Sequence, residues 1–587
     1  MNKFFITFKI PHKSYYYKVA LAGTFNNWNQ NVHYLKKINS DWIITIELEP
    51  GYYEYKFVIN DNIWINDAQN IRTNVLDQNN SIILIDENGL SIFNKEFNEN
   101  YFPQIIYPDE KYKKLYNELY HQLFSKISYG NTKNNFSKIY FNEGKDDCIY
   151  QWDCCFSELF LMFGNNVFPL MANIDNFYRV QSADGYIPRL LRVIDGLPTA
   201  EYKKSAPLIN PPIFSYIEWK YLYFTGNIER IKNIFEKIEK YYFWIEENLS
   251  IEYNNRLFYN TLLGSGMDNL QREHLNKKSV WIDMSSQQAL SSLILYKLCK
   301  LLNYYEKEKL FLQRYNEIKN EINKYCWDNE TNYYYDVKED GSKLKLKTAA
   351  GFWPYLASLA TPEQIDLFIL HLLDPTKFYR KNVVPALSAD EEGYSSMGWQ
   401  WRGGVWSQIN YILFEGLKNY NYFYIPYILT KRNLSNIQKV FYEFEPEQDK
   451  ISPLEKNVYT NTFWEFYAPD FEKPAYRWDN NYYCKANYLN WTALSVINMF
   501  IENILGFDFN GLNNLINLRI FEIDENYRGI DRFYFRGKPL KIIYKLDKDK
   551  IILEYSCEEE INLCVNYKGK VFNQFICGNN KVIELKI

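Results

Sequence analysis

Acidic side chains inside aromatic, glycine-bearing segments are the residues of this chain best suited to chemistry. Asp268 lies in LLGSGMDNLQ (262–271), Glu465 lies in TFWEFYAPDF (462–471), and GWQWRGGVWSQINYILFEGL (398–417) runs between them. With 71 Asp and Glu residues in the chain, a carboxyl group says little by itself, and its surroundings must select it. One protonated and one ionised carboxyl group can together cleave a glycosidic bond, the first by assisting the leaving oxygen and the second by activating water.

Composition excludes several other classes of function. The net charge is −4 and the Lys and Arg residues are scattered, which weighs against nucleic-acid binding. The five His residues lack the spacing of a zinc site or a catalytic triad. No apolar stretch approaches the roughly 18 residues of a membrane span, and the N-terminus has no signal-peptide core. Nine Cys residues without framework spacing favour a reducing compartment, so we expect a cytoplasmic protein.

Three regions of different periodicity must position these groups. Residues 1–88 contain short apolar runs broken by Asn and Gly and predict a β-sandwich, followed by a linker at 89–104. Over 105–510 the apolar residues recur every 3.6 positions and predict a helical domain, with one helix start marked by a capping box at Thr361. Residues 511–587 return to strands such as KIIYKL and KVIELKI and predict a small β domain.

The N-terminal region carries a specific pattern in VALAGTFNNWN, LEPGYYEYKFVINDNIWIND and NNSIILI. It resembles the family-48 carbohydrate-binding modules, which include the glycogen-binding domain of AMP-activated kinase β subunits. By position, the resemblance implies that Trp28, Trp64 and Asn80 contact a glucan, with Lys56 as a further polar contact. Indole rings stack on sugar faces, and an amide satisfies hydroxyl groups. The alternative is that both indoles only pack within the module.

The acidic segments resemble, in order and over roughly residues 148–508, a clan of inverting glycosidases. This clan contains trehalase, the α-glucosidase that trims N-glycans, and mannosylglycerate hydrolases. The matching segments are QWDCCF (151–156), QSADGYIPRLL (181–191), INPPIFSYIEWKYLYFTGN (209–227), SGMDN (265–269), WRGGVW (401–406) and FWEFY (463–467). The resemblance implies a multidomain fold in which the central all-α region is an (α/α)6 barrel between the two β domains.

Carried over by position, the resemblance makes Asp268 the general acid and Glu465 the general base. Inversion requires these carboxyl groups to stand about 6.5–9.5 Å apart, with a water between them. The substrate-binding residues that it implies are Trp152, Trp401 and Trp406 as pocket walls, Arg402 as a clamp, and Asp153, Asn269 and Asp283 as hydroxyl contacts. Core packing for the Trp residues, an ion pair for Arg402 and helix capping for Asp283 are the alternatives. No metal or organic cofactor is called for.

One departure from the clan is Gly264, which stands where relatives usually carry Glu, so a sugar contact or a charge that tunes Asp268 is missing. The leading expectation is an inverting α-glucosidase that acts on α-glucan ends or short α-glucosides. A carbohydrate is the expected partner, and no nucleic acid or membrane is. The alternatives are a trehalase or a glucosyl- or mannosylglycerate-type hydrolase, and a non-catalytic glucan-binding scaffold protein. Retention of both carboxyl groups argues against the scaffold.

Overall fold

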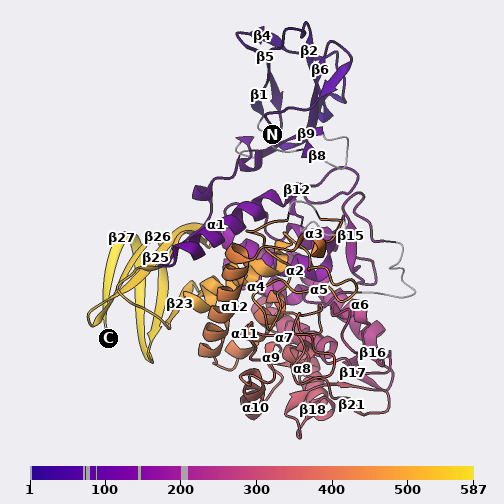
Figure 1. Cartoon of the computed structure of the whole chain (residues 1–587), viewed down its shortest axis with the longest axis vertical. Coiled ribbons are helices and arrows are strands. Elements are labelled where there is room, and N and C mark those ends of the chain that lie inside the picture. Colours follow the sequence, from indigo (N-terminus) through magenta and orange to yellow (C-terminus); the bar gives the residue numbers. More distant parts are fainter. Residues whose placement is uncertain are drawn as a thin grey trace. The chain divides into compact units, whose positions relative to one another are not determined.

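The chain folds into two compact units in the computed structural model, shown as a ribbon in Figure 1. The structure describes residues 3–70, 73–74, 80–86, 89–94, 96–142, 147–199, 209–455 and 458–587. Unit 1 comprises residues 1–99, 124–142 and 193–196, and unit 2 comprises residues 100–123, 143–192 and 197–587. Within the described ranges, no helix combines the length and apolar character needed to cross a membrane.

Two β-sheets that share one apolar core make up most of unit 1, as the sequence predicts. The smaller sheet has the strand order β1 (Phe4–Pro11), β5 (Asp41–Leu48), β4 (Lys36–Ile38). The larger sheet has the order β10 (Gly89–Leu90), β9 (Asn80–Asp86), β6 (Gly51–Ile59), β2 (Val19–Gly23), β3 (His33–Tyr34), with β7 (Ile63–Ile65) on β6 and β8 (Thr73–Asn74) on β9. Phe8, Leu21 and Phe57 meet in the core because alternate side chains of a strand point to the same face.

A hairpin from the region predicted as helical also belongs to unit 1. Its strands are β12 (Ile127–Tyr129) and β13 (Ile139–Phe141), which pair antiparallel. The ring of Tyr129 lies 5.4 Å from the ring of Tyr52 on β6. This arrangement differs from the predicted boundaries, which place all of 105–510 in the helical domain. The difference arises because an aromatic contact between distant segments leaves no local periodicity in the sequence.

Helices dominate the middle of unit 2, in agreement with the 3.6-residue period. They are α1 (Glu110–Ser125), α2 (Gln151–Leu161), α3 (Ala172–Arg179), α4 (Phe214–Thr225), α5 (Ile228–Leu249), α6 (Leu262–Ser265), α7 (Ile282–Leu302), α8 (Tyr305–Tyr325), α9 (Trp353–Leu356), α10 (Pro362–Leu372), α11 (Ser407–Lys418), α12 (Tyr424–Glu443), α13 (Leu489–Ala493) and the π-helix η7 (Leu494–Ile504). Successive contacts join α2 to α4, α4 to α7, α7 to α9, α9 to α11, α11 to η7, and η7 back to α2. Every residue of α2 is buried, as expected of a helix enclosed by others.

The C-terminal part of unit 2 is a β-sheet, as the short apolar runs predict, and it is drawn in yellow in Figure 1. Its strand order is β11 (Gln104–Ile106), β24 (Arg528–Phe535), β25 (Lys538–Asp547), β26 (Lys550–Tyr567), β23 (Leu515–Ile520), β22 (Phe507–Asn510), with β27 (Lys570–Lys586) paired to β26. β11 comes from the predicted linker and pairs antiparallel with β24. A strand that precedes the helices in the sequence thus forms one edge of a sheet whose other strands come after them.

Glu158 on α2 predicts a pH dependence of stability. Its Oε2 accepts the backbone N–H of Met171 at 2.6 Å, and its side chain is fully buried. Burial raises the pKa of this carboxyl group from 4.5 to about 8. Since the folded chain then holds a proton that the unfolded chain releases, the free energy of unfolding falls as the pH rises between these two values.

We expect Glu158→Gln, which keeps the shape but cannot ionise, to have nearly the wild-type Tm at pH 5. At pH 8.5 its Tm is expected to lie several degrees above that of the wild type, as measured by thermal unfolding over a pH series. Glu306→Gln, at an exposed residue of α8, serves as the control and should show no such divergence. A Glu158→Gln curve that runs parallel to the wild type across this range would contradict the prediction.

Candidate active site

A short turn after α6 presents Asp268. Gly266 ends the helix in the left-handed region at φ 72°, and a Cβ at this position would lie 2.5 Å from the Trp152 ring. Met267 and Leu270 are fully buried on either side of the acid. Asp268 itself is exposed. The carboxyl group therefore projects from a turn that its neighbours anchor.

Asn269 fastens this turn to the loop that contains Trp399 and Trp401. Its Nδ2 donates to the carbonyl oxygen of Trp399 at 2.9 Å, and its Oδ1 accepts the N–H of Trp401 at 2.9 Å. From the same loop, Nε of Arg402 donates to the carbonyl oxygen of Asn269 at 3.3 Å. The predicted sugar contacts Asn269 and Arg402 thus use these atoms to hold two loops together.

A row of aromatic rings runs between the two acidic segments. The ring of Trp152 lies 6.2 Å from that of Trp401, which stacks on Trp406 at 4.3 Å with 3° between the planes. Trp406 in turn stacks on Phe466 at 4.0 Å. Two parallel rings this close cannot share one face of Trp406, so both of its faces are covered. Trp406 therefore supports its neighbours and offers no face on which a sugar ring can stack.

Glu465 immediately precedes Phe466, the last ring of that row, and is partly exposed. Its backbone N–H donates to the carbonyl oxygen of Lys485 at 3.0 Å. The neighbouring Ala486 donates its N–H to both carboxylate oxygens of Glu455 at 3.2 Å. Burial raises the pKa of Glu455, and the negative charge of Glu465 raises it further. A second acid therefore lies within electrostatic reach of Glu465, and no sequence motif pointed to it.

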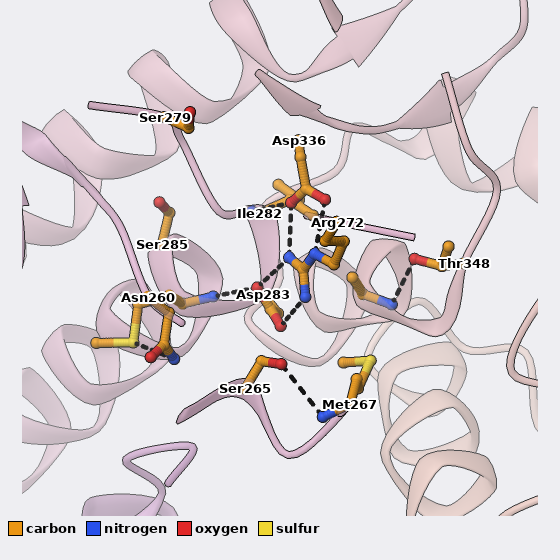
Figure 2. A network of polar contacts seen from close by, with 12 residues as sticks. Asn260, Ser265, Met267, Arg272, Ser279, Ile282, Asp283, Ser285, Asp336 and Thr348 are labelled. Carbon is orange, nitrogen blue, oxygen red and sulfur yellow. Dashed lines mark hydrogen bonds and ion pairs between the residues drawn. The ribbon is translucent and has the colours of Figure 1, made fainter. Parts of the chain in front are cut away.

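Arg272, four residues after Asp268, lies at the centre of a buried ion network (Figure 2). Its guanidinium group donates to both oxygens of Asp283 at 2.7 and 2.9 Å, and to both oxygens of Asp336 at the same two distances. The group also lies 4.1 Å from the centre of the Trp281 ring. Asp283 has no exposed surface. This predicted hydroxyl contact is a structural ion pair instead, because a buried carboxylate needs a cation beside it.

Asp153 is another predicted hydroxyl contact that lies in the interior, with 1% of its surface exposed. Its Oδ1 accepts the hydroxyl of Tyr488 at 2.5 Å, and its carbonyl oxygen accepts Nδ2 of Asn490 at 2.9 Å. These bonds connect the first turn of α2 to the start of α13. Asp153 thus positions two helices, and no contact with sugar is proposed for it.

The glycine at 264 is accommodated by Asn260. A Cβ at Gly264 would lie 2.1 Å from Oδ1 of Asn260, which accepts the N–H of Thr261 at 2.8 Å. The Asn260 side chain is buried. A Glu at position 264 would therefore need the Asn260 side chain to move.

In unit 1, the four predicted glucan-binding residues line one hollow of about 860 Å³. The rings of Trp28 and Trp64 lie 6.2 Å apart at 44°, and Trp64 is 42% exposed. Asn80 donates through Nδ2 to Oε2 of Glu54 at 2.7 Å. Lys56 also lines the hollow. The fold thus brings together the residues that the sequence singled out here.

Comparison with known proteins gives two matches to families. Residues 149–492 match the mannosylglycerate hydrolase MGH1-like glycoside hydrolase domain, and residues 6–91 match the glycogen recognition site of AMP-activated protein kinase. A Borreliella burgdorferi protein described as uncharacterised is 28% identical over 415 residues, 70% of this chain and 83% of its own length. Mannosyl-oligosaccharide glucosidase of Saccharomyces cerevisiae is 22% identical over 347 residues, 57% of this chain and 39% of its own length.

Among solved structures, GH63 mannosylglycerate hydrolase from Thermus thermophilus, in complex with Tris and D-glycerate, is similar with a TM-score of 0.50 at 16% identity. The match covers 65% of this chain and 99% of the other. The similarity is one of fold.

Proposed function

The chain belongs to the mannosylglycerate hydrolase MGH1-like glycoside hydrolases, and on this premise we propose that it is an inverting α-glucosidase acting on α-glucan ends or short α-glucosides. That it is a glycoside hydrolase with a glycogen-recognition module follows from the two family matches. The observation that carries the proposal is the pair of accessible acids, Asp268 and Glu465, on segments joined through a single row of stacked rings.

In the proposed mechanism, Asp268 donates its proton to the glycosidic oxygen as the bond from that oxygen to the anomeric carbon breaks. Glu465 takes a proton from a water that attacks the same carbon from the opposite face, which inverts its configuration. Both acids then regain their starting states by exchanging protons with solvent. Glu455, which holds the N–H of Ala486, positions the segment that pairs with Glu465.

We further propose that α2, α4, α7, α9, α11 and η7 form the inner layer of an (α/α)6 barrel, an arrangement supported by their closed circle of contacts. The predicted limits 1–88, 105–510 and 511–587 stay part of this proposal, with the β12–β13 hairpin reassigned to the N-terminal module. A cytoplasmic location is favoured by nine cysteines that are all free thiols.

A second candidate is hydrolysis of a small solute such as trehalose or mannosylglycerate. It is favoured by the family match, which is described as mannosylglycerate hydrolase MGH1-like, and by a probable trehalase of Eremothecium gossypii that is 28% identical over 132 residues. A non-catalytic scaffold is the weaker alternative, because the chain keeps both acids on accessible positions.

A substrate panel tests the proposed function. Trehalose, maltose, kojibiose, nigerose, isomaltose, glycogen, glucosylglycerate and mannosylglycerate are incubated with the enzyme, and the released sugar is measured. We expect glucose from the α-glucan and α-glucoside members, with the β anomer appearing first in a proton NMR time course because inversion changes the configuration. Preference for trehalose or mannosylglycerate would establish the second candidate. The α anomer as first product would refute inversion.

A further inference from the structure

The hollow that contains Trp28 and Trp64 has a second wall outside the carbohydrate-binding module. This wall is the tip of the β12–β13 hairpin, which lies beyond the module's match at residues 6–91. Its lining residues include Asn131, Thr132, Lys133, Asn135 and Lys138. The module's aromatic face is therefore covered on one side by a segment of the same unit.

The hairpin tip is held in place by Asn134, which is 4% exposed. Its Nδ2 donates to the carbonyl oxygen of Val193 at 2.9 Å. Its Oδ1 accepts the N–H groups of Asn131 and Phe136 at 3.0 and 3.1 Å. A Cβ at Gly196 would lie 2.0 Å from the Asn134 carbonyl oxygen, so the backbones are in close contact. The wall is thus organised before any ligand arrives, which lowers the entropic cost of binding.

The opposite wall is also fixed. The hydroxyl of Tyr52 donates to Oε1 of Glu54, whose Oε2 accepts Nδ2 of Asn80. This chain of bonds sets the orientation of the Asn80 amide, which lines the same hollow as the indole of Trp64. Aromatic faces flanked by amide and ammonium groups match a sugar chain, which has apolar ring faces and hydroxyl edges. A hollow of about 860 Å³ lies within the usual range of sites that bury most of a small ligand.

We propose that Lys133, Asn135 and Lys138 of the hairpin are saccharide-binding residues, so that module and hairpin together enclose a segment of a neutral glucan chain. The sugar rings stack on the indoles, and their outer hydroxyl groups hydrogen-bond to the hairpin side chains. This inference rests on the proposed carbohydrate binding by the module. The hairpin then contributes part of the binding affinity, and the module without the hairpin would bind the glucan more weakly.

Binding of maltoheptaose by the full chain, measured by isothermal titration calorimetry, tests the proposal. All proteins carry Asp268→Asn to suppress turnover. The maltoheptaose binding that is lost in Trp64→Ala is taken as the binding due to the carbohydrate-binding module. The hairpin variant is Lys133→Ala, Asn135→Gly and Lys138→Ala combined. Glycine suits position 135, where φ is 52°. Ser128→Ala, on the same hairpin but outside the hollow, is the matched control.

We expect the hairpin variant to bind about five- to tenfold more weakly, which corresponds to the net loss of about one hydrogen bond at an exposed site. Ser128→Ala should bind normally, because its side chain does not line the hollow. Normal binding by the hairpin variant, with weak binding by Trp64→Ala, would overturn the inference alone. Normal binding by both the hairpin variant and Trp64→Ala would overturn carbohydrate binding by the module as well. The substrate panel tests hydrolysis independently of either outcome.

Discussion

Asp268→Asn is expected to lower kcat by about 100- to 10,000-fold on natural glucosides, the range for loss of a general acid. The amide keeps the size of the side chain but has no proton to give to the leaving oxygen. The Tm should stay within about a degree of the wild type, because surface substitutions of this kind usually cost little. The turn is held by Met267, Asn269 and Leu270, and Asp268 is exposed.

α-Glucosyl fluoride separates the two proposed roles. Fluoride leaves without a proton, so Asp268→Asn should retain much of its activity on this substrate. Glu465→Gln should be slow on both substrates, because water activation is needed in each case. Glu273→Gln, at an exposed acid just after the turn, should behave as the wild type. Near-normal turnover by Asp268→Asn on every α-glucoside in the panel would remove the assignment.

Arg272→Ala is expected to reduce the free energy of unfolding of unit 2 by about 3–5 kcal/mol, the usual cost of breaking a buried ion pair. It leaves Asp283 and Asp336 buried without their shared cation. Activity should fall with it, since Arg272 follows the Asp268 turn directly. Arg272→Lys should give an intermediate result, because an ammonium group cannot reproduce the paired bonds of a guanidinium group. Denaturant unfolding together with kcat on the best substrate measures both effects.

Two further variants complete this test. Lys309→Ala removes an exposed pair with Glu306 and should change stability by less than about 1 kcal/mol. The triple variant Arg272→Met, Asp283→Asn and Asp336→Asn removes all three charges but keeps acceptors for the N–H groups of Met284 and Ile282. It should recover much of the stability lost in Arg272→Ala. Wild-type stability of Arg272→Ala would contradict the role assigned to the network.

Local pattern in the sequence accounts for the secondary structure well. The capping box at Thr361 is confirmed, since Thr361 and Gln364 exchange hydrogen bonds between side chain and backbone at the start of α10. Alternation predicts the two sheets of unit 1, and the 3.6-residue period predicts the helices of unit 2. Each of these signals involves residues within a few positions of one another, so a single sequence contains all of it.

Short motifs in the sequence also carried the family resemblance and pointed to the two acids. A motif such as SGMDN shows the acid together with its immediate neighbours, so it can be recognised from the sequence alone. Which polar residues meet each other was decided only in the folded chain. Arg272 pairs with both Asp283 and Asp336, Asp153 accepts the hydroxyl of Tyr488, and Trp406 lies between the rings of Trp401 and Phe466. Asp336, Tyr488 and Phe466 are each 60 or more residues from their partners, and the pairing of such groups depends on which segments the fold packs together.

The same reasoning explains the two segments that changed region. The β12–β13 hairpin joins the N-terminal module, and β11 joins the C-terminal sheet. Residue types determined that these segments could form strands. The choice of sheet or module depended on which strand edge or aromatic face each segment meets in the folded chain, since pairing with that edge or covering that face is favourable.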